Sequence, residues 1–380
     1  MPAELRRARA ATMLLFAFTG ALSATWSSRI PAVQDRLGLT PGTLAVAILG
    51  LEAGAIAGLP GGGALVARIG SRRSLALGYA LAPAGLLAAG LAPSLAALVA
   101  AVALFAAANS VIDVAMNVQG IELERRYGRP ILAGLHAGHP LGLFAGGLAA
   151  TAAAAGGLAP GDHFAVVAAL AVPLGIGASR ALVAEPGSRD RVRLVRPRGP
   201  LLVLGLVAFC AFLLDGGAYN WSAVHLRGTL GASPGLAAAG FSAFALAVAA
   251  GRLRSDRLVA RLGRARFVRL AALVAAAGAA VVVAAGQPAV GIAGWMLLGV
   301  GLAGIAPTVL GAAPALADVR PPVAIAAVTM IGYLGSFTGP PAIGAVAQAT
   351  GLSAALALLV AAALAAGALA PRALRVTRED

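Results

Sequence analysis

The sequence predicts an all-α membrane protein with twelve transmembrane helices, arranged as two parallel six-helix halves. Composition is the first observation that predicts this class. Hydrophobic residues make up 60% of the 380 residues and charged residues only 11%, whereas a soluble domain carries about 25% charged residues. A chain of this composition cannot cover a surface that faces water, so it belongs in a lipid bilayer.

An internal repeat is the second observation. A short arginine-rich turn occurs twice, with an offset of 193 residues: LVARIGSRR at 65–73 and LVARLGRAR at 258–266. Two dipeptides recur at nearly the same offset, Pro41-Gly42 with Pro234-Gly235 and Trp26-Ser27 with Trp221-Ser222. A repeat this long is not a solenoid. We interpret it as one doubled segment whose two copies share a fold.

Each expected helix is a stretch of about 20 mostly apolar residues, the length that crosses a bilayer. Twelve stretches meet this condition, six in each half: 9–28, 43–66, 74–92, 94–121, 131–156, 163–183, 200–221, 235–253, 267–286, 288–311, 322–347 and 351–370. Several are rich in alanine and weak individually. The doubled pattern supports them, because spans of the two halves are related by the same offset.

The arginines predict the orientation of these spans. Lysine is absent, so all 29 basic residues are arginine. With the N-terminus inside, all but Arg29, Arg36 and Arg227 fall on the cytoplasmic side, as the positive-inside rule requires. Both termini are then cytoplasmic, which agrees with an even number of spans. We expect halves at 1–184 and 200–380, joined by a basic cytoplasmic linker at 185–199.

Six plus six spans, a basic linker and arginine turns after spans 2 and 8 resemble the major facilitator superfamily over nearly the whole chain. The first turn matches the loop signature of that family at Gly63, Arg68, Gly70, Arg72 and Arg73, with Ala67 where an acidic residue is usual. The second turn matches at Gly251, Asp256, Arg257, Arg261, Gly263, Arg264 and Arg266. The resemblance implies that both turns are cytoplasmic gating loops and that Asp256 is their clearest acidic partner.

Three stretches narrow the resemblance: DVAMNVQG (113–120), LHAGHPLG (135–142) and DGGAYNWSAVHLR (215–227). They are similar to a bacterial subgroup of inner-membrane permeases that is distantly related to the fucose–proton symporters. In that subgroup the position of Asp215 is commonly glutamate. The resemblance implies a transporter of the bacterial cytoplasmic membrane that works by alternating access, with spans 1, 4, 7 and 10 lining a central cavity. It does not fix the substrate.

Acidic side chains inside the spans are the first site candidates, because ionisable groups are costly in hydrocarbon. These are Glu52, Asp113 and Asp215. Asn109, Asp113 and Asn117 are spaced i, i+4 and i+8, which places them on one face of a helix. We interpret this face as a site for a proton or a substrate. A static polar contact between helices is the alternative.

Histidines and aromatic residues complete the candidate set. His136 and His139 lie in span 5, and His139 falls at about the depth of Asp113, so a proton relay is one interpretation; hydrogen bonds to backbone carbonyls are the other. Tyr219 follows Asp215 by one helical turn, and Tyr333 shares a face of span 11 with two hydroxyl residues. Trp26 and Trp221 are expected to anchor the membrane interface.

Glycines recur every four residues in span 2, from Gly50 to Gly62, and in span 5, from Gly134 to Gly146. Such stripes let helices approach closely. The resemblance places them on surfaces that slide between the two halves during alternating access. Static packing is the alternative.

Several classes of function are disfavoured. One cysteine and four histidines make no metal cluster, and a phosphate loop ending in lysine is impossible without lysine. We therefore expect no enzyme activity, no cofactor and no metal, no nucleic-acid partner, and a monomer in the lipid bilayer. The preferred function is symport of a sugar-like or other small polar solute with protons. The alternatives are proton-antiport efflux of a drug or metabolite, a non-transporting sensor, and a membrane-embedded lipid enzyme.

Overall fold

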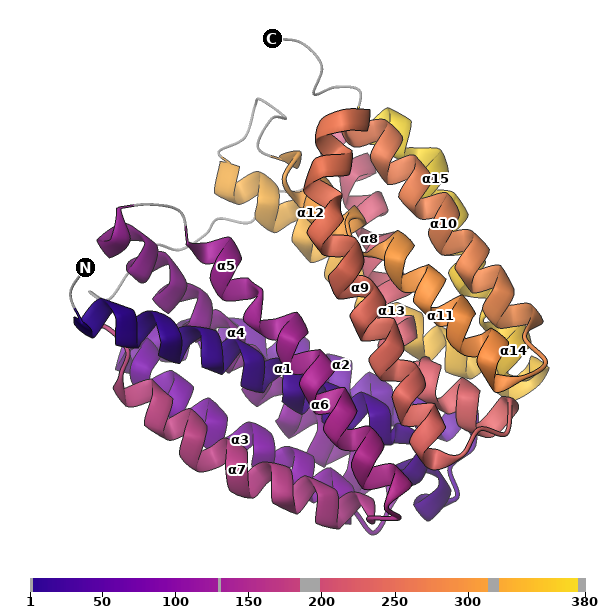
Figure 1. Ribbon diagram of the computed structural model, residues 1–380, viewed down its shortest axis with the longest axis horizontal. Helices are drawn as coiled ribbons and strands as arrows, with labels where there is room; N and C mark the ends of the chain where they lie inside the picture. The colour runs from indigo at the N-terminus through magenta and orange to yellow at the C-terminus, as the bar shows by residue number, and fades with distance from the viewer. Residues whose placement is uncertain (1–2, 129–130, 185–198, 314–320, 375–380) are drawn as a thin grey trace. The chain divides into compact units, whose positions relative to one another are not determined.

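The computed structural model describes residues 3–128, 131–184, 199–313 and 321–374, and their regular structure is helical (Figure 1). The predicted linker lies outside the described residues except for Gly199. The chain divides into two compact units. Unit 1 comprises Met1–Leu39, Val46–Arg189 and Pro234–Ser242, and unit 2 comprises Thr40–Ala45, Asp190–Ser233 and Ala243–Asp380.

The first half of the chain forms seven helical segments: α1 (Ala3–Leu37), α2 (Pro41–Ile69), α3 (Ser71–Leu91), α4 (Leu95–Tyr127), α5 (Leu132–His136), α6 (Gly138–Ala155) and α7 (Pro160–Arg180). In unit 1, α1 packs on α6, α7 and α4, while α3 packs on α4 and α7 (Figure 1). The segments α5 and α6 together occupy the predicted span 131–156.

The second half forms α8 (Pro200–Val224), the π-helix η1 (His225–Thr229), α9 (Pro234–Leu262), α10 (Arg264–Ala284), α11 (Pro288–Leu302), α12 (Ile305–Leu310), α13 (Pro321–Thr350), α14 (Leu352–Ala355) and α15 (Ala357–Leu374). In unit 2, α8 packs on α13 and α15, while α10 packs on α11 and α15. These pairs repeat those of unit 1, with α8 in the place of α1 and α10 in the place of α3. The doubled sequence therefore encodes a doubled packing pattern.

The repeated turn has the same backbone geometry in both copies. Gly70 precedes α3 with φ 80° and ψ 160°, and Gly263 precedes α10 with φ 75° and ψ 155°. Residues with a side chain rarely adopt positive φ, so glycine is the residue that allows this tight entry into the helix. The sequence repeat is thus also a repeat of local structure.

Ten helical stretches of the described chain are long and apolar enough to cross a membrane. The two other predicted spans correspond to the broken α5–α6 segment and to α13. The observed helices extend beyond several predicted limits: α1 continues to Leu37 and α9 to Leu262. A transmembrane helix can extend beyond the hydrocarbon layer, so the hydropathy of the sequence locates the centre of a helix better than its ends. The predicted all-helical membrane architecture is confirmed.

Two spans are interrupted ahead of a proline. The break between α5 and α6 falls at Ala137, three residues before Pro140, and the break between α11 and α12 falls at 303–304, ahead of Pro307. Proline has no N–H and its ring clashes with the carbonyl four residues earlier. The carbonyls of His136 and Ala303 consequently lack their i+4 helical donors.

The glycine stripes hold helices together within unit 1, so the static interpretation is the one that the packing supports. A methyl group added at Gly54 would overlap the backbone of Ala103 on α4, and one added at Gly142 would overlap the carbonyl oxygen of Ala17 on α1. Gly134, the first member of the second stripe, has no heavy atom within 4 Å of such a methyl group.

The interface role expected for the tryptophans is wrong. Trp26 is 3% exposed and Trp221 is fully buried. The indole Nε1 of Trp221 donates to the carbonyl oxygen of Pro340 at 3.0 Å, which ties α8 to α13 inside unit 2. Trp221 therefore serves as an internal clamp between two helices rather than as a membrane anchor.

Candidate functional site

A hydrogen-bonded chain of polar side chains crosses from α4 to α5 in unit 1. The Nδ2 group of Asn117 donates to the backbone carbonyl of Asp113 at 2.9 Å and to its Oδ1 at 3.3 Å. The Oδ1 of Asn117 lies 3.0 Å from Nε2 of His136. Because an amide oxygen can only accept, His136 must be the donor in this pair. A carboxylate, an amide and an imidazole are thus linked in sequence.

The surroundings of this chain combine polar and apolar groups. Asp113, Asn117 and Asn109 are half-buried on the same side of α4, as their spacing predicts. The Oδ1 of Asn109 is buried without a hydrogen-bond partner among the described residues. The ring of Phe16 on α1 lies 4.5 Å, centre to centre, from that of His136. The site therefore draws on α1, α4 and α5.

The break ahead of Pro140 explains why His136 joins this chain. It ends α5 at His136, so the side chain is not held by a continuous helix. Because His139 is predicted at about the same membrane depth as Asp113, the sequence favours His139 as the partner of Asp113. In the structure His139 is half-buried on α6. Glu52 is 8% exposed on α2. The hydrogen bond to Asn117 is made by His136.

In unit 2, Asp215 on α8 is half-buried, and a pair of aromatic rings involves the residue one turn before it and the residue one turn after it. One turn before it on α8, Phe212 lies 5.5 Å from the ring of Tyr333 on α13. One turn after it, Tyr219 meets Phe244 on α9 edge-to-face at 6.0 Å. The spacing of Phe212, Asp215 and Tyr219 places them on one side of α8, and each of the two rings contacts an aromatic residue of another helix. Aromatic faces beside a carboxylate can hold a ring-shaped polar molecule.

Arg252 on α9 is a functional candidate that the sequence analysis missed. Its charge acts on Asp215 and on Tyr219, and its Nε donates to the carbonyl oxygen of Ala303 at 3.3 Å. That carbonyl is available because residue 307 is proline. The predicted span 235–253 contains Arg252, but the positive-inside count assigns it to the cytoplasmic side. In the structure α9 continues ten residues beyond Arg252.

The predicted gating turns are mostly exposed. In the first, Gly63, Arg68, Arg72 and Arg73 are exposed and Gly70 is half-buried; in the second, Asp256, Arg257, Arg261, Gly263 and Arg264 are exposed. The ion pairs among the described residues involve neither turn. Both use Glu122 near the end of α4, with Arg125 at 2.8 Å and Arg126 at 2.6 Å. The i, i+3 and i, i+4 spacing of this cluster was readable in the sequence.

A second missed group lies where α1 and α7 come together in unit 1. Arg29 is 3% exposed, and its Nη2 donates to the carbonyl oxygen of Leu158. Its Nε and Nη1 have no partner among the described residues, and neither does Nδ1 of the buried His163. The sequence predicts an outer segment at Arg29. Arg29 lies inside α1 because that helix continues eight residues further.

Comparisons with known proteins place the chain in a family. The Major Facilitator Superfamily model matches residues 204–380. An uncharacterized MFS-type transporter of Yersinia pestis is 32% identical over 343 residues, which cover 90% of this chain and 89% of the relative. The chain belongs to the major facilitator superfamily. The protein is thus a membrane transporter rather than an enzyme, and its substrate is a small molecule.

Solved structures agree with this assignment at the level of the fold. A mutant form of the nucleoside transporter NupG has a TM-score of 0.80 at 10% identity, with 97% of this chain and 100% of that chain covered. A D-xylose–proton symporter has a TM-score of 0.79 at 14% identity, with 99% of both chains covered. The major facilitator fold is confirmed over the whole transporter.

Proposed function

We propose that this major facilitator superfamily transporter is a proton-coupled symporter of a small polar, sugar-like solute and that it works by alternating access. The linked side chains of Asp113, Asn117 and His136 carry this proposal. An acid inside a membrane span is retained where it faces a partner or a cavity and takes part in function. Here the acid has an imidazole within reach through a single amide.

The proposed division of labour follows from the chemistry of these groups. Asp113 takes up and releases the coupling proton, and His136 is the second titratable group. Asn117 positions both, because its amide accepts from one and donates to the other. When Asp113 is protonated, its carboxyl oxygen accepts a hydrogen bond from Asn117 less strongly, so the amide that contacts His136 on α5 is held less firmly. Proton binding is thereby linked to a movement of helices.

Solute binding is assigned to the aromatic cluster around Asp215. Its carboxylate accepts hydrogen bonds from hydroxyl groups, and Tyr219 and Tyr333 offer ring faces and phenol groups. Arg252 provides the balancing charge. Two proteins of the same fold, the nucleoside transporter and the D-xylose–proton symporter, move polar solutes, which is compatible with a polar solute here. A place near the fucose–proton symporters remains part of the proposal, as do cytoplasmic termini and the gating role of the arginine turns.

Transport by purified protein in sealed vesicles tests the proposal. A thermal-shift screen of aldopentoses, aldohexoses and deoxyhexoses first selects the sugar that stabilises the protein most. An inward proton gradient should then drive uptake of that sugar, at about tenfold accumulation per pH unit for one coupled proton. Asp113→Asn should abolish this accumulation and keep sugar–sugar exchange. The control is Asp162→Asn, which changes an exposed acid in the first turn of α7.

Each outcome separates the competing functions. If Asp113→Asn leaves sugar accumulation and its pH dependence unchanged, Asp113 is not the proton-coupling residue. Export of solute as protons enter would replace symport with antiport efflux. Binding of the selected sugar without any flux would assign the protein to the sensors.

A further inference from the structure

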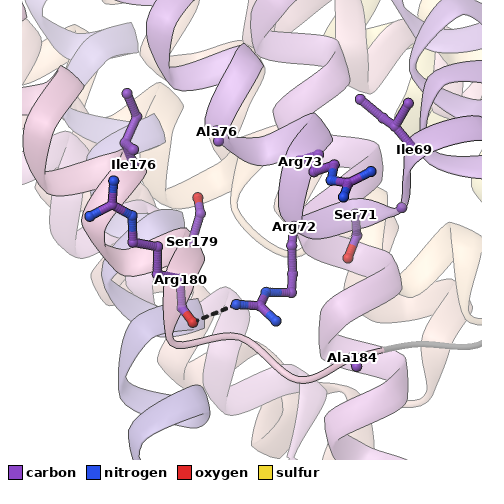
Figure 2. A pocket seen from close by; sticks show the side chains of 10 residues that line it. Ile69, Ser71, Arg72, Arg73, Ala76, Ile176, Ser179, Arg180 and Ala184 are labelled. Atoms are coloured by element: carbon purple, nitrogen blue, oxygen red, sulfur yellow. Dashed lines mark hydrogen bonds between the residues drawn. The ribbon is translucent and has the colours of Figure 1, made fainter.

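A cavity of about 600 Å³ lies in unit 1 between the start of α3 and the end of α7. Three arginines line it: Arg72 and Arg73 from the first turn of α3, and Arg180 from the last turn of α7 (Figure 2). None of its lining residues, all of which the structure describes, is acidic. We call this cavity the arginine pocket.

The three arginines of the pocket are exposed. The Nη2 of Arg72 donates to the backbone carbonyl oxygen of Arg180 at 2.8 Å. Figure 2 shows Arg72 between α3 and α7, with Arg73 and Arg180 to either side. Since the ion pairs of the described chain are those of Glu122, no described carboxylate neutralises these three charges.

The backbone adds to the positive potential. The first N–H groups of any helix lack internal acceptors, and the aligned peptide dipoles make this end positive. In α3 the residue that precedes the helix is Gly70, which supplies no side-chain cap. Ala67, one turn earlier, also supplies no acid. An anion in the pocket would meet three guanidinium groups and an uncapped helix.

The helices that frame the pocket continue with exposed apolar side chains. Leu77 and Leu81 on α3 and Leu170 and Leu174 on α7 are between 38% and 58% exposed. In a membrane-spanning protein such surfaces contact hydrocarbon chains. The arginine pocket therefore stands at the end of an apolar surface, which is the arrangement of a phospholipid with its headgroup at one end and its acyl chains at the other.

We propose that the arginine pocket binds the phosphate headgroup of an anionic phospholipid whose acyl chains lie against α3 and α7. A zwitterionic headgroup would leave the charge of the pocket uncompensated, so the site favours a lipid with net negative charge. Basic pockets between transmembrane helices are suited to such headgroups. In the predicted orientation this lipid belongs to the cytoplasmic leaflet.

Thermal unfolding of the full chain in a neutral detergent tests the proposal. Phosphatidylglycerol, phosphatidylcholine with the same acyl chains, and inorganic phosphate are each titrated into the micelles. Phosphatidylglycerol should raise the unfolding temperature at lower concentrations than phosphatidylcholine, because ligands that bind the native state stabilise it. Inorganic phosphate, which is the headgroup chemistry without the chains, should have little effect.

A pair of double variants locates the effect. Arg72→Gln with Arg73→Gln should weaken the response to phosphatidylglycerol about twenty-five-fold, at roughly fivefold for each arginine. Arg264→Gln with Arg266→Gln removes two charges from the first turn of α10 and should leave the response unchanged. Arg180→Gln supplies a single change on α7, with about a fivefold loss expected.

Two results would overturn the inference. An equal loss in both double variants would assign the effect to general surface charge. Equal stabilisation by inorganic phosphate and by phosphatidylglycerol would make the pocket a site for a free anion. Neither result bears on proton coupling at Asp113, so the two proposals stand or fall separately.

Discussion

Arg252 allows a sharp test of how unit 2 holds a positive charge within a membrane-spanning helix. Its Nε donates to the carbonyl oxygen of Ala303 at 3.3 Å, and that carbonyl has no helical donor because residue 307 is proline. The predicted effect is therefore a coupling. The hydrogen bond from Arg252 should stabilise the protein only while Pro307 keeps the carbonyl of Ala303 unoccupied.

Arg252→Met should lower the free energy of unfolding by about 1 kcal/mol. A hydrogen bond to a charged group contributes about 1.5–3 kcal/mol, whereas bonds between membrane helices average about 0.6 kcal/mol. The long distance and the exposed side chain of Arg252 favour the lower part of this range. Methionine keeps the apolar stem, so the loss reports the guanidinium group rather than packing.

Pro307→Ala completes a double-mutant cycle. Alanine at 307 has an N–H that can close the helical bond onto Ala303, so Arg252→Met should then cost less than about 0.5 kcal/mol. The charge interaction between Arg252 and Asp215 is present in both backgrounds and cancels. A coupling energy of about 0.5–1 kcal/mol is the expected result.

Reversible unfolding in mixed micelles of a mild detergent and dodecyl sulfate, followed by circular dichroism, measures the four free energies. Arg254→Met is the matched control, because Arg254 is exposed two residues further along α9; its effect should stay within about 0.5 kcal/mol. If the costs of Arg252→Met and Pro307→Ala simply add, the explanation through the freed carbonyl is refuted.

The remaining predictions concern unit 1. Gly142→Ala should lower the free energy of unfolding by about 1–3 kcal/mol in the same assay, because the added methyl overlaps the backbone of Ala17. The control Gly134→Ala should change it by no more than about 0.5 kcal/mol. Equal losses in the two variants would contradict the packing role of the glycine stripe. Asn117→Leu removes the hydrogen bonds to Asp113 and from His136. It should lower proton-driven sugar uptake by at least about fivefold, the loss expected for a single hydrogen bond, and keep sugar–sugar exchange. An equal loss of uptake and exchange would point to misfolding instead of coupling.

The fold was predictable because its determinants are local or repeated. Apolar stretches of about 20 residues mark helix centres, and the repeated arginine-rich turn at 65–73 and 258–266 predicts two similar halves. Helix ends were less predictable. Helix α9 continues to Leu262 because arginine and leucine are good helix formers outside the hydrocarbon as well. Arg252 lies one residue before the predicted end of its span at 253, so the positive-inside count assigns it to the cytoplasmic side although the helix continues past it.

The candidate site was predictable where it depends on one helix and not where it depends on packing. The spacing of Asn109, Asp113 and Asn117 placed them together on α4, and the structure agrees. Whether His136 or His139 meets Asn117 depends on the break ahead of Pro140 and on how α5 packs against α4. The pairing of Arg252 with Ala303 likewise needs two helices and a proline-freed carbonyl, which no spacing within one segment reveals.

The two units kept one packing pattern while their polar groups diverged, and this divergence supports the proposed division of labour. Unit 1 holds an acid, an amide and an imidazole, the groups suited to carry a proton. Unit 2 holds an acid and an arginine beside aromatic rings, the groups suited to hold a solute. This division between proton coupling in unit 1 and solute binding in unit 2 predicts that Asp113→Asn and Arg252→Met impair different steps of transport. The first should uncouple transport from the proton gradient with little change in sugar affinity, and the second should weaken sugar binding while protons still drive whatever is bound.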